Sequence, residues 1–319
     1  MTKPQIIFAS LLFCVQTCTY AQSTEKVRLV ISSPEKIFLG QSFQVGNGKT
    51  ADQVEVNIYL PDSYHSQPLS QATQKNKPAK HYPVLYVIDG GKQQDFKQIA
   101  GLGALASINP YIFEEIIVVG IATTNRLFKL TSMNLDRRYD RPEGQIGGAD
   151  QFRAKIRNLV QPFIDQNYRT SSRKIVVGES LAGLFISETL LKTPDLFTDY
   201  IVVNPSLWCD DRQLAKQAGE LLSKHRDDRK NLYVTMANEG GTMQKGLDEL
   251  LKAIQDSGLK HLRTNYVDRR SNDFHWTIYH QAVLEALAWI LPTNGPDYAD
   301  DLDPWYLIEG ANPPGWSEN

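Results

Sequence analysis

The stretch KIVVGESLAGLF, residues 174–185, decides the fold. In it, a β-branched apolar run leads directly into a glycine, a serine and a helix-like segment. The motif G-x-S-x-G turns a strand sharply into a helix and lifts the serine hydroxyl above the sheet, and small flanking residues let this turn close. Here Ala182 replaces the second glycine and Gly183 follows at once. The stretch therefore predicts a strand-to-helix turn at Ser180, with the serine acting either as a nucleophile or as a helix cap.

Short apolar runs on both sides of this stretch predict further strands. Near-continuous β-branched or aromatic runs are typical of strands covered on both faces of a parallel sheet, and here they alternate with amphipathic segments. Apolar and polar residues alternate at 53–60, as in a half-buried antiparallel strand. We therefore expect one α/β domain with a mostly parallel, doubly wound sheet and antiparallel N-terminal strands. The predicted parallel strands besides 173–180 are PVLYVIDGG (83–91), EIIVVGI (115–121), DYIVVNPS (199–206) and NLYVTMAN (231–238).

The two ends of the chain differ from this core. Residues 1–21 combine Lys3, a short apolar run and small residues at positions 19 and 21, a pattern that predicts a cleaved export signal. The run is too short to span a bilayer, for which a helix needs roughly 20 residues. We therefore expect a secreted or periplasmic protein in which residues 22–319 form a single domain, with no membrane attachment after signal cleavage. From about residue 293 the acidic, aromatic and proline-rich sequence predicts an extended tail.

Composition excludes several classes of function. The chain has 319 residues and a formal net charge of −2, so it lacks the basic field that recruits nucleic acid. Loss of the signal would leave Cys209 as the only cysteine, which predicts no internal disulfide. The six histidines are scattered rather than closely spaced as in a zinc site, and no G-x-G-x-x-G follows a predicted strand. We therefore expect neither a metal nor a cofactor.

A nucleophilic serine needs a general base, and hydrolases with this turn carry their catalytic residues in the chain order Ser, Asp or Glu, His. Two histidines lie late enough in the chain, His275 and His280. His275 follows the last predicted strand in a loop, and such a loop can place an imidazole over Ser180. His280 falls inside a helical pattern and fits a structural role. The sequence therefore favours His275 as the base.

The acid that would hold this histidine is expected at the end of another strand. Glu239 ends the run NLYVTMANE and is followed by two glycines that relax the local geometry. Asp248 is the alternative, although its amphipathic surroundings suit an exposed helix face. Asp268 or Asp273 could instead brace the histidine loop. Glu239 is the preferred acid.

Ester cleavage through a tetrahedral intermediate also needs backbone N–H donors aimed at the oxyanion. One donor would be the N–H of Leu181, the residue after the nucleophile. The second would come from the loop after PVLYVIDGG, where paired glycines leave the backbone accessible. We expect Gly91 to supply it.

These residues, taken in order with the stretches VEVNIYLPDSY, YPVLYVIDGG and FHWTIYHQ, resemble the "Putative esterase" family of α/β-hydrolases. This family contains enterochelin-type siderophore esterases, feruloyl and acetylxylan esterases, S-formylglutathione hydrolases and mycolyltransferases. The resemblance covers about residues 35–292 and implies the α/β-hydrolase fold with a triad of Ser180, Glu239 and His275. It also implies that Arg126 and Trp208 line the substrate cleft. Asn204 departs from the pattern, because many relatives carry serine there.

The expected function is that of an exported serine hydrolase. It would cleave a small-molecule carboxylic ester through an acyl-serine intermediate, with a siderophore-type ester or a small acyl or feruloyl ester as substrate. Segments 122–148 and 205–225 would form the cleft walls that select the substrate. Two alternatives are a catalytically inactive binding protein on the same fold and an acyltransferase that uses the same triad with an alcohol acceptor.

Overall fold

The computed structural model describes residues 36–46, 48, 53–66, 79–109, 111–226 and 228–294. The unit Leu39–Asn319 is compact, and the fold below is that of its described part. The predicted export signal at 1–21 lies outside the described residues, as does the predicted tail from residue 295 onward, so both stay predictions. Within the described residues, no helix has the length and apolar character that crossing a membrane requires.

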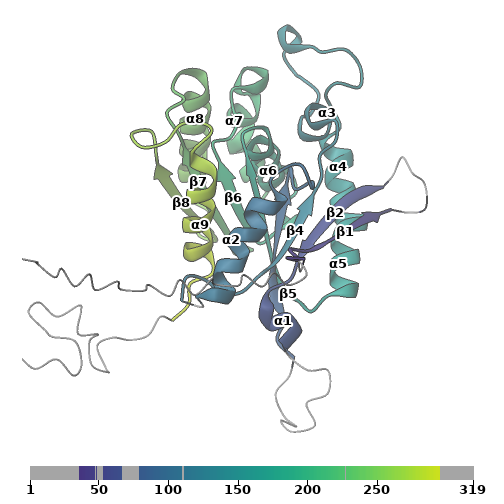
Figure 1. Cartoon of the computed structure of the whole chain (residues 1–319). Coiled ribbons are helices and arrows are strands. Elements are labelled where there is room, and N and C mark those ends of the chain that lie inside the picture. Colours follow the sequence, from purple (N-terminus) through teal and green to yellow (C-terminus); the bar gives the residue numbers. More distant parts are fainter. Residues whose placement is uncertain are drawn as a thin grey trace, which may run out of the picture. The chain divides into compact units, whose positions relative to one another are not determined.

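The described strands form one sheet of eight strands in the order β1-β2-β4-β3-β5-β6-β7-β8 (Figure 1). Strand β2 pairs antiparallel with both β1 and β4, whereas the pairs from β4 through β8 are parallel. This arrangement confirms the predicted mostly parallel sheet with antiparallel N-terminal strands. The strands are β1 Gln41–Val45, β2 Val54–Tyr59, β3 Tyr82–Ile88, β4 Ile117–Ile121, β5 Thr170–Glu179, β6 Asp199–Val203, β7 Lys230–Met236 and β8 Leu262–Asp268.

Helices connect the parallel strands, as right-handed crossovers require. The predicted helix around 152–163 is interrupted by a π-helical segment, Ile156–Val160, which ends two residues before Pro162. Proline has no N–H to donate within a regular helix, and the wider turn accommodates it. The helices are α1 Asp62–Ser66, α2 Phe96–Ile108, α3 Arg126–Leu130, α4 Ala149–Lys155, α5 Gln161–Asn167, α6 Leu181–Lys192, α7 Cys209–Leu222, α8 Gly241–Ser257 and α9 Ile278–Ile290.

The core lies on both faces of the sheet. Alternate side chains of β5 point to opposite faces: Val176 belongs to the core cluster that includes residues of α4 to α8, whereas Ile175 and Val177 belong to the cluster that includes residues of α2 and α9. All three are fully buried. Burial of such a side chain stabilises the fold by about 1.5–3 kcal/mol. Two-sided burial explains why the sequence of this strand is continuously apolar and not alternating.

Candidate active site

Ser180 forms the whole turn between β5, which ends at Glu179, and α6, which begins at Leu181. Its backbone has φ 57° and ψ −114°, a conformation that costs a non-glycine residue about 1–3 kcal/mol. Hydrogen bonds hold it in place: the Ser180 N–H donates to Val203 O at 3.0 Å, and the Ser180 carbonyl accepts from the N–H of Leu184 and of Ser206. The hydroxyl makes no capping hydrogen bond to α6, so Ser180 does not act as a side-chain cap of this helix.

Small residues let the turn close, as the motif requires. A Cβ on Gly178 would lie 2.7 Å from the Ala182 Cβ, and one on Gly183 would lie 2.9 Å from Val203 O. The methyl group of Ala182 is fully buried against the bare backbone of Gly178. Alanine in place of the second glycine is therefore accommodated without loss of the turn.

His275 and Glu239 meet at the ends of neighbouring strands. Glu239 follows β7, and His275 lies in the loop between β8 and α9. The His275 Nδ1 lies 2.6 Å from Glu239 Oε1. A carboxylate is a strong acceptor for an N–H donor, so this contact favours the proton on Nδ1 and leaves Nε2 free to accept one. Asp248, the alternative acid, instead accepts a hydrogen bond from Gln244 within α8 at 2.7 Å.

Two residues that follow β6, Asn204 and Ser206, also belong to this arrangement. The sequence did not predict either of them as a site residue. Asn204 is fully buried, accepts the Ala237 N–H on its Oδ1 and donates through Nδ2 to Glu239 Oε1 at 2.7 Å. The Ser206 hydroxyl lies 3.2 Å from the Ser180 Oγ. Both follow the apolar run DYIVV, so the rule that polar residues after a strand belong to the site could have found them.

The two expected oxyanion donors differ in their surroundings. Leu181 is the first residue of α6, where backbone N–H groups have no partner within the helix. The Gly91 N–H donates to Gln94 Oε1 at 3.0 Å, an oxygen that also accepts from the Thr123 N–H at 3.2 Å. The Gln94 side chain therefore occupies the predicted second donor in this structure.

Arg126 is the first residue of α3, and its side chain contacts Asp89 and the backbone of Glu179. Its Nε lies 2.5 Å from Asp89 Oδ2, and its Nη2 donates to the Glu179 carbonyl at 3.3 Å. Asp89 directly follows β3 with a φ of 64°, and its side chain is only 8% exposed, against 40% for Arg126. Arg126 thus connects the loop that carries Gly91 with the residue before Ser180.

Three acidic side chains near the turn, Glu179, Asp95 and Asp89, interact with one another. Burial, with the nearby Asp95 carboxylate, raises the pKa of Glu179 to about 7, although Arg126 opposes this shift. Burial and the charge of Asp89 raise the pKa of Asp95 to about 6. Burial also raises the pKa of Asp89, against the opposing effect of Arg126. Near neutral pH this region therefore holds protons that exposed carboxyls would have lost. Among the described residues, no three His, Cys, Asp or Glu side chains gather as a metal site.

Trp208 lines a cavity of about 430 Å³, and its own surface is 44% exposed. The cavity walls come from segments 127–146 and 208–217 and from α6, so both segments expected to form the cleft contribute to it. Ser180 is outside the lining. Leu184 of the lining lies one helical turn further along α6, and its N–H donates to the Ser180 carbonyl at 2.9 Å.

Known proteins resemble this chain over most of its length. A family model described as "Putative esterase" matches residues 48–290. The ferri-bacillibactin esterase BesA of Bacillus subtilis (strain 168) is 23% identical over 239 residues, which are 69% of this chain and 82% of BesA. An IroE-like serine hydrolase from Shewanella oneidensis has a TM-score of 0.66 at 24% identity, with 79% of this chain and 80% of that chain covered. The siderophore hydrolase EstA from Aspergillus nidulans has a TM-score of 0.64 at 18% identity, with coverages of 82% and 98%. These likenesses confirm the predicted α/β-hydrolase fold.

Proposed function

This chain belongs to the "Putative esterase" family of carboxylic ester hydrolases, and from that premise we propose that it cleaves its ester with Ser180 as nucleophile through an acyl-serine intermediate. The observation that carries the proposal is the backbone of Ser180. A strained conformation at a non-glycine residue, with no capping bond to explain the serine, supports a role for its half-buried hydroxyl.

His275 is the proposed general base. Its Nε2 would take the Ser180 proton as the oxygen attacks the ester carbonyl, deliver that proton to the leaving alcohol, and then activate water for deacylation. In the structure the Ser180 hydroxyl contacts the Ser206 hydroxyl, and proton transfer requires the Ser180 oxygen and the His275 imidazole to come within hydrogen-bond distance. Glu239, held by Asn204, would keep the imidazole in its productive tautomer and stabilise its charged form.

The oxyanion would be bound by the N–H groups of Leu181 and Gly91. The Gly91 donor becomes available only when the Gln94 side chain turns away, because Gln94 Oε1 occupies it at 3.0 Å. Arg126 and Trp208 are the proposed substrate contacts of the cleft. Arg126 has 40% of its side chain exposed, and this exposed part could face an anionic group of the substrate.

The proposed substrate is a small-molecule ester, of the siderophore type or of a small acyl or feruloyl acid. The relatives support this class of substrate, since BesA is named a ferri-bacillibactin esterase and EstA a siderophore hydrolase. We also propose that the protein works outside the cytoplasm, secreted or periplasmic, on the basis of the signal-like sequence at 1–21.

Labelling with a fluorophosphonate, read by intact mass and peptide mapping, tests the nucleophile without the natural substrate. We expect one adduct on Ser180, lost in Ser180→Ala and strongly slowed in His275→Ala. His280→Ala is the matched control, because His280 on α9 bonds to Gln98 and should leave labelling unchanged. A folded protein that takes no adduct would contradict the proposal and favour the alternative of a binding protein on this fold. If labelling succeeds, products formed with an added alcohol separate acyl transfer from hydrolysis.

A further inference from the structure

The cavity beside Trp208 has the properties of a small-molecule site. Its volume of about 430 Å³ falls within the range of about 300–1,000 Å³ that is typical of ligand pockets. Met133 and Trp208, both in the lining, remain 68% and 44% exposed, so the cavity is open to solvent beside them. Its apolar lining includes Leu127, Leu130, Met133, Leu184, Trp208 and Leu214.

The carboxylates of this lining already have partners within the protein. Glu188 accepts Arg153 Nη1 at 2.9 Å on one oxygen, and both Ser132 Oγ and Lys192 Nζ at 2.6 Å on the other. Asp210 accepts two backbone N–H groups. Burial raises the pKa of the Cys209 thiol to about 12, so this group stays neutral. A cationic ligand would therefore find no free carboxylate here, whereas an apolar group would find apolar walls.

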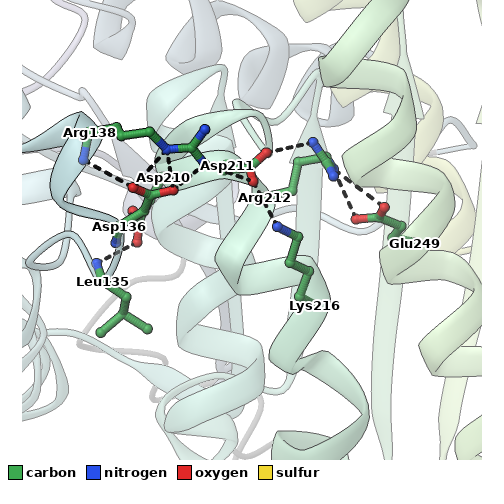
Figure 2. Close-up of polar contacts among 8 residues, drawn as sticks. All are labelled: Leu135, Asp136, Arg138, Asp210, Asp211, Arg212, Lys216 and Glu249. Atoms are coloured by element: carbon green, nitrogen blue, oxygen red, sulfur yellow. Dashed lines mark hydrogen bonds and ion pairs between the residues drawn. The ribbon is translucent and has the colours of Figure 1, made fainter.

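The wall formed by the segment after α3 is tied to α7 (Figure 2). Asp210 accepts the N–H groups of Leu135 at 2.7 Å and Asp136 at 2.9 Å. Arg138 lies between the carboxylates of Asp136 and Asp211 (Figure 2). Its Nη2 is 2.5 Å from Asp136 Oδ2 and 3.6 Å from Asp211 Oδ2. The bonds of Asp210 to Leu135 and Asp136, and that of Arg138 to Asp211, join residues more than seventy positions apart and connect the two segments that line the cavity.

The start of α7 is strained where it makes these bonds. Asp210, Asp211 and Arg212 have φ values of 49°, 49° and 63°, in the left-handed region that non-glycine residues avoid. Arg212 is held by Glu249 of α8 at 3.2 Å, and Asp211 by Lys216 at 2.9 Å. Ion pairs with Glu249 and Lys216 thus hold residues 210–212 in this conformation. In it, the Asp210 carboxylate accepts the N–H groups of Leu135 and Asp136.

The cavity adjoins the proposed nucleophile. Leu184 reaches it from the first turn of α6, and its N–H donates to the Ser180 carbonyl. Trp208 also lines it, two residues after Ser206, whose hydroxyl lies 3.2 Å from Ser180 Oγ. Two residues of the lining thus come from the two segments that contact Ser180, the start of α6 and the loop after β6.

We infer that this cavity binds the apolar acyl group of the ester, so that the protein prefers esters of a larger apolar carboxylic acid to acetate esters. The inference rests on the proposed function, because it takes Ser180 as the atom that carries the acyl group. Each buried methylene adds binding free energy, and where binding strengthens in the transition state the rate constant kcat/KM rises with chain length.

Hydrolysis of 4-nitrophenyl acetate, butyrate and octanoate tests this. We expect kcat/KM for octanoate to exceed that for acetate by at least about tenfold in the wild type. Leu214→Trp, and the milder Leu214→Phe, fill the cavity from α7 and should abolish this preference while acetate is still cleaved. Glu220→Trp adds the same side chain to an exposed position of α7 outside the lining and should keep the preference. An unchanged chain-length profile in folded Leu214 variants, or a wild type that prefers acetate, would overturn the inference.

Calorimetric titration with octanoate separates the cavity from the chemistry. The Ser180→Ala protein should bind octanoate, and the Ser180→Ala, Leu214→Trp double variant should lose that binding. If no ester is cleaved but octanoate still binds in this way, the proposed function fails and the apolar site stands. If esters are cleaved but octanoate binds neither protein, the proposed function stands and the acyl pocket is refuted.

Discussion

Replacing Arg126 with alanine leaves Asp89 as a buried carboxylate without its cation. The pair is close, with Nε 2.5 Å from Oδ2, and the Asp89 side chain is 8% exposed. Breaking a fully buried pair costs about 3–5 kcal/mol, whereas an exposed pair contributes about 0–1 kcal/mol. Arg126 is 40% exposed and Asp89 keeps its hydrogen bond from the Thr123 hydroxyl, so this pair falls between the two limits. We expect the free energy of unfolding to fall by about 1–3 kcal/mol at pH 7.

This loss of unfolding free energy should depend on pH, and the burial of Asp89 beside Arg126 determines in which direction. Burial raises the pKa of Asp89 above its usual value while Arg126 lowers it. Without Arg126 this pKa rises further, so the folded state resists ionisation of Asp89 more strongly. A carboxyl with a raised pKa in the folded state destabilises as pH rises through that pKa. The loss of unfolding free energy in Arg126→Ala should therefore be smallest at acidic pH and grow toward neutral pH. Asp95 and Glu179 add to this trend, because Arg126 lowers their pKa values too.

Urea unfolding of the wild type, Arg126→Ala, Asp89→Asn and the double variant, from pH 4.5 to 8, measures this coupling. Arg137→Ala is the control, because the side chain of Arg137 is 96% exposed and pairs only loosely, at 3.7 Å, with Asp140. We expect a coupling energy of about 1 kcal/mol or more at pH 7 that shrinks at low pH. Equal losses from Arg126→Ala in the wild-type and Asp89→Asn backgrounds would refute the reasoning, as would a loss that does not vary with pH.

Two further predictions concern the turn itself. Ser180→Gly should abolish fluorophosphonate labelling while raising the free energy of unfolding by about 1 kcal/mol, because glycine adopts φ 57° without strain; a variant less stable than the wild type in urea would contradict this. Burial raises the pKa of Glu179 from 4.5 to about 7, so the stability due to its protonated form is present at low pH and lost as pH rises between these values. Glu179→Gln should flatten the fall in unfolding free energy over that window, and curves of identical slope in the two proteins would rule this out.

The fold was predictable from local patterns. Strands buried on both faces read as continuous apolar runs, and residues 174–185 carry both the central strand and the turn that follows it. The chain order of Ser180, Glu239 and His275 was readable for the same reason, since each follows an identifiable strand. The π-helical segment before Pro162 was not predicted, because an amphipathic pattern does not distinguish a wide turn from a regular one.

The sequence by itself determined which residues could do chemistry, because strand ends and turn motifs are local features. Only the tertiary structure decided which of them meet. Asn204 beside Glu239, Gln94 beside Thr123, and Asp210 bound to the wall of the cavity all join residues from different strands or loops. The physical reason is that these contacts depend on the register and twist of neighbouring strands at one edge of the sheet, and no single stretch of sequence encodes that alignment.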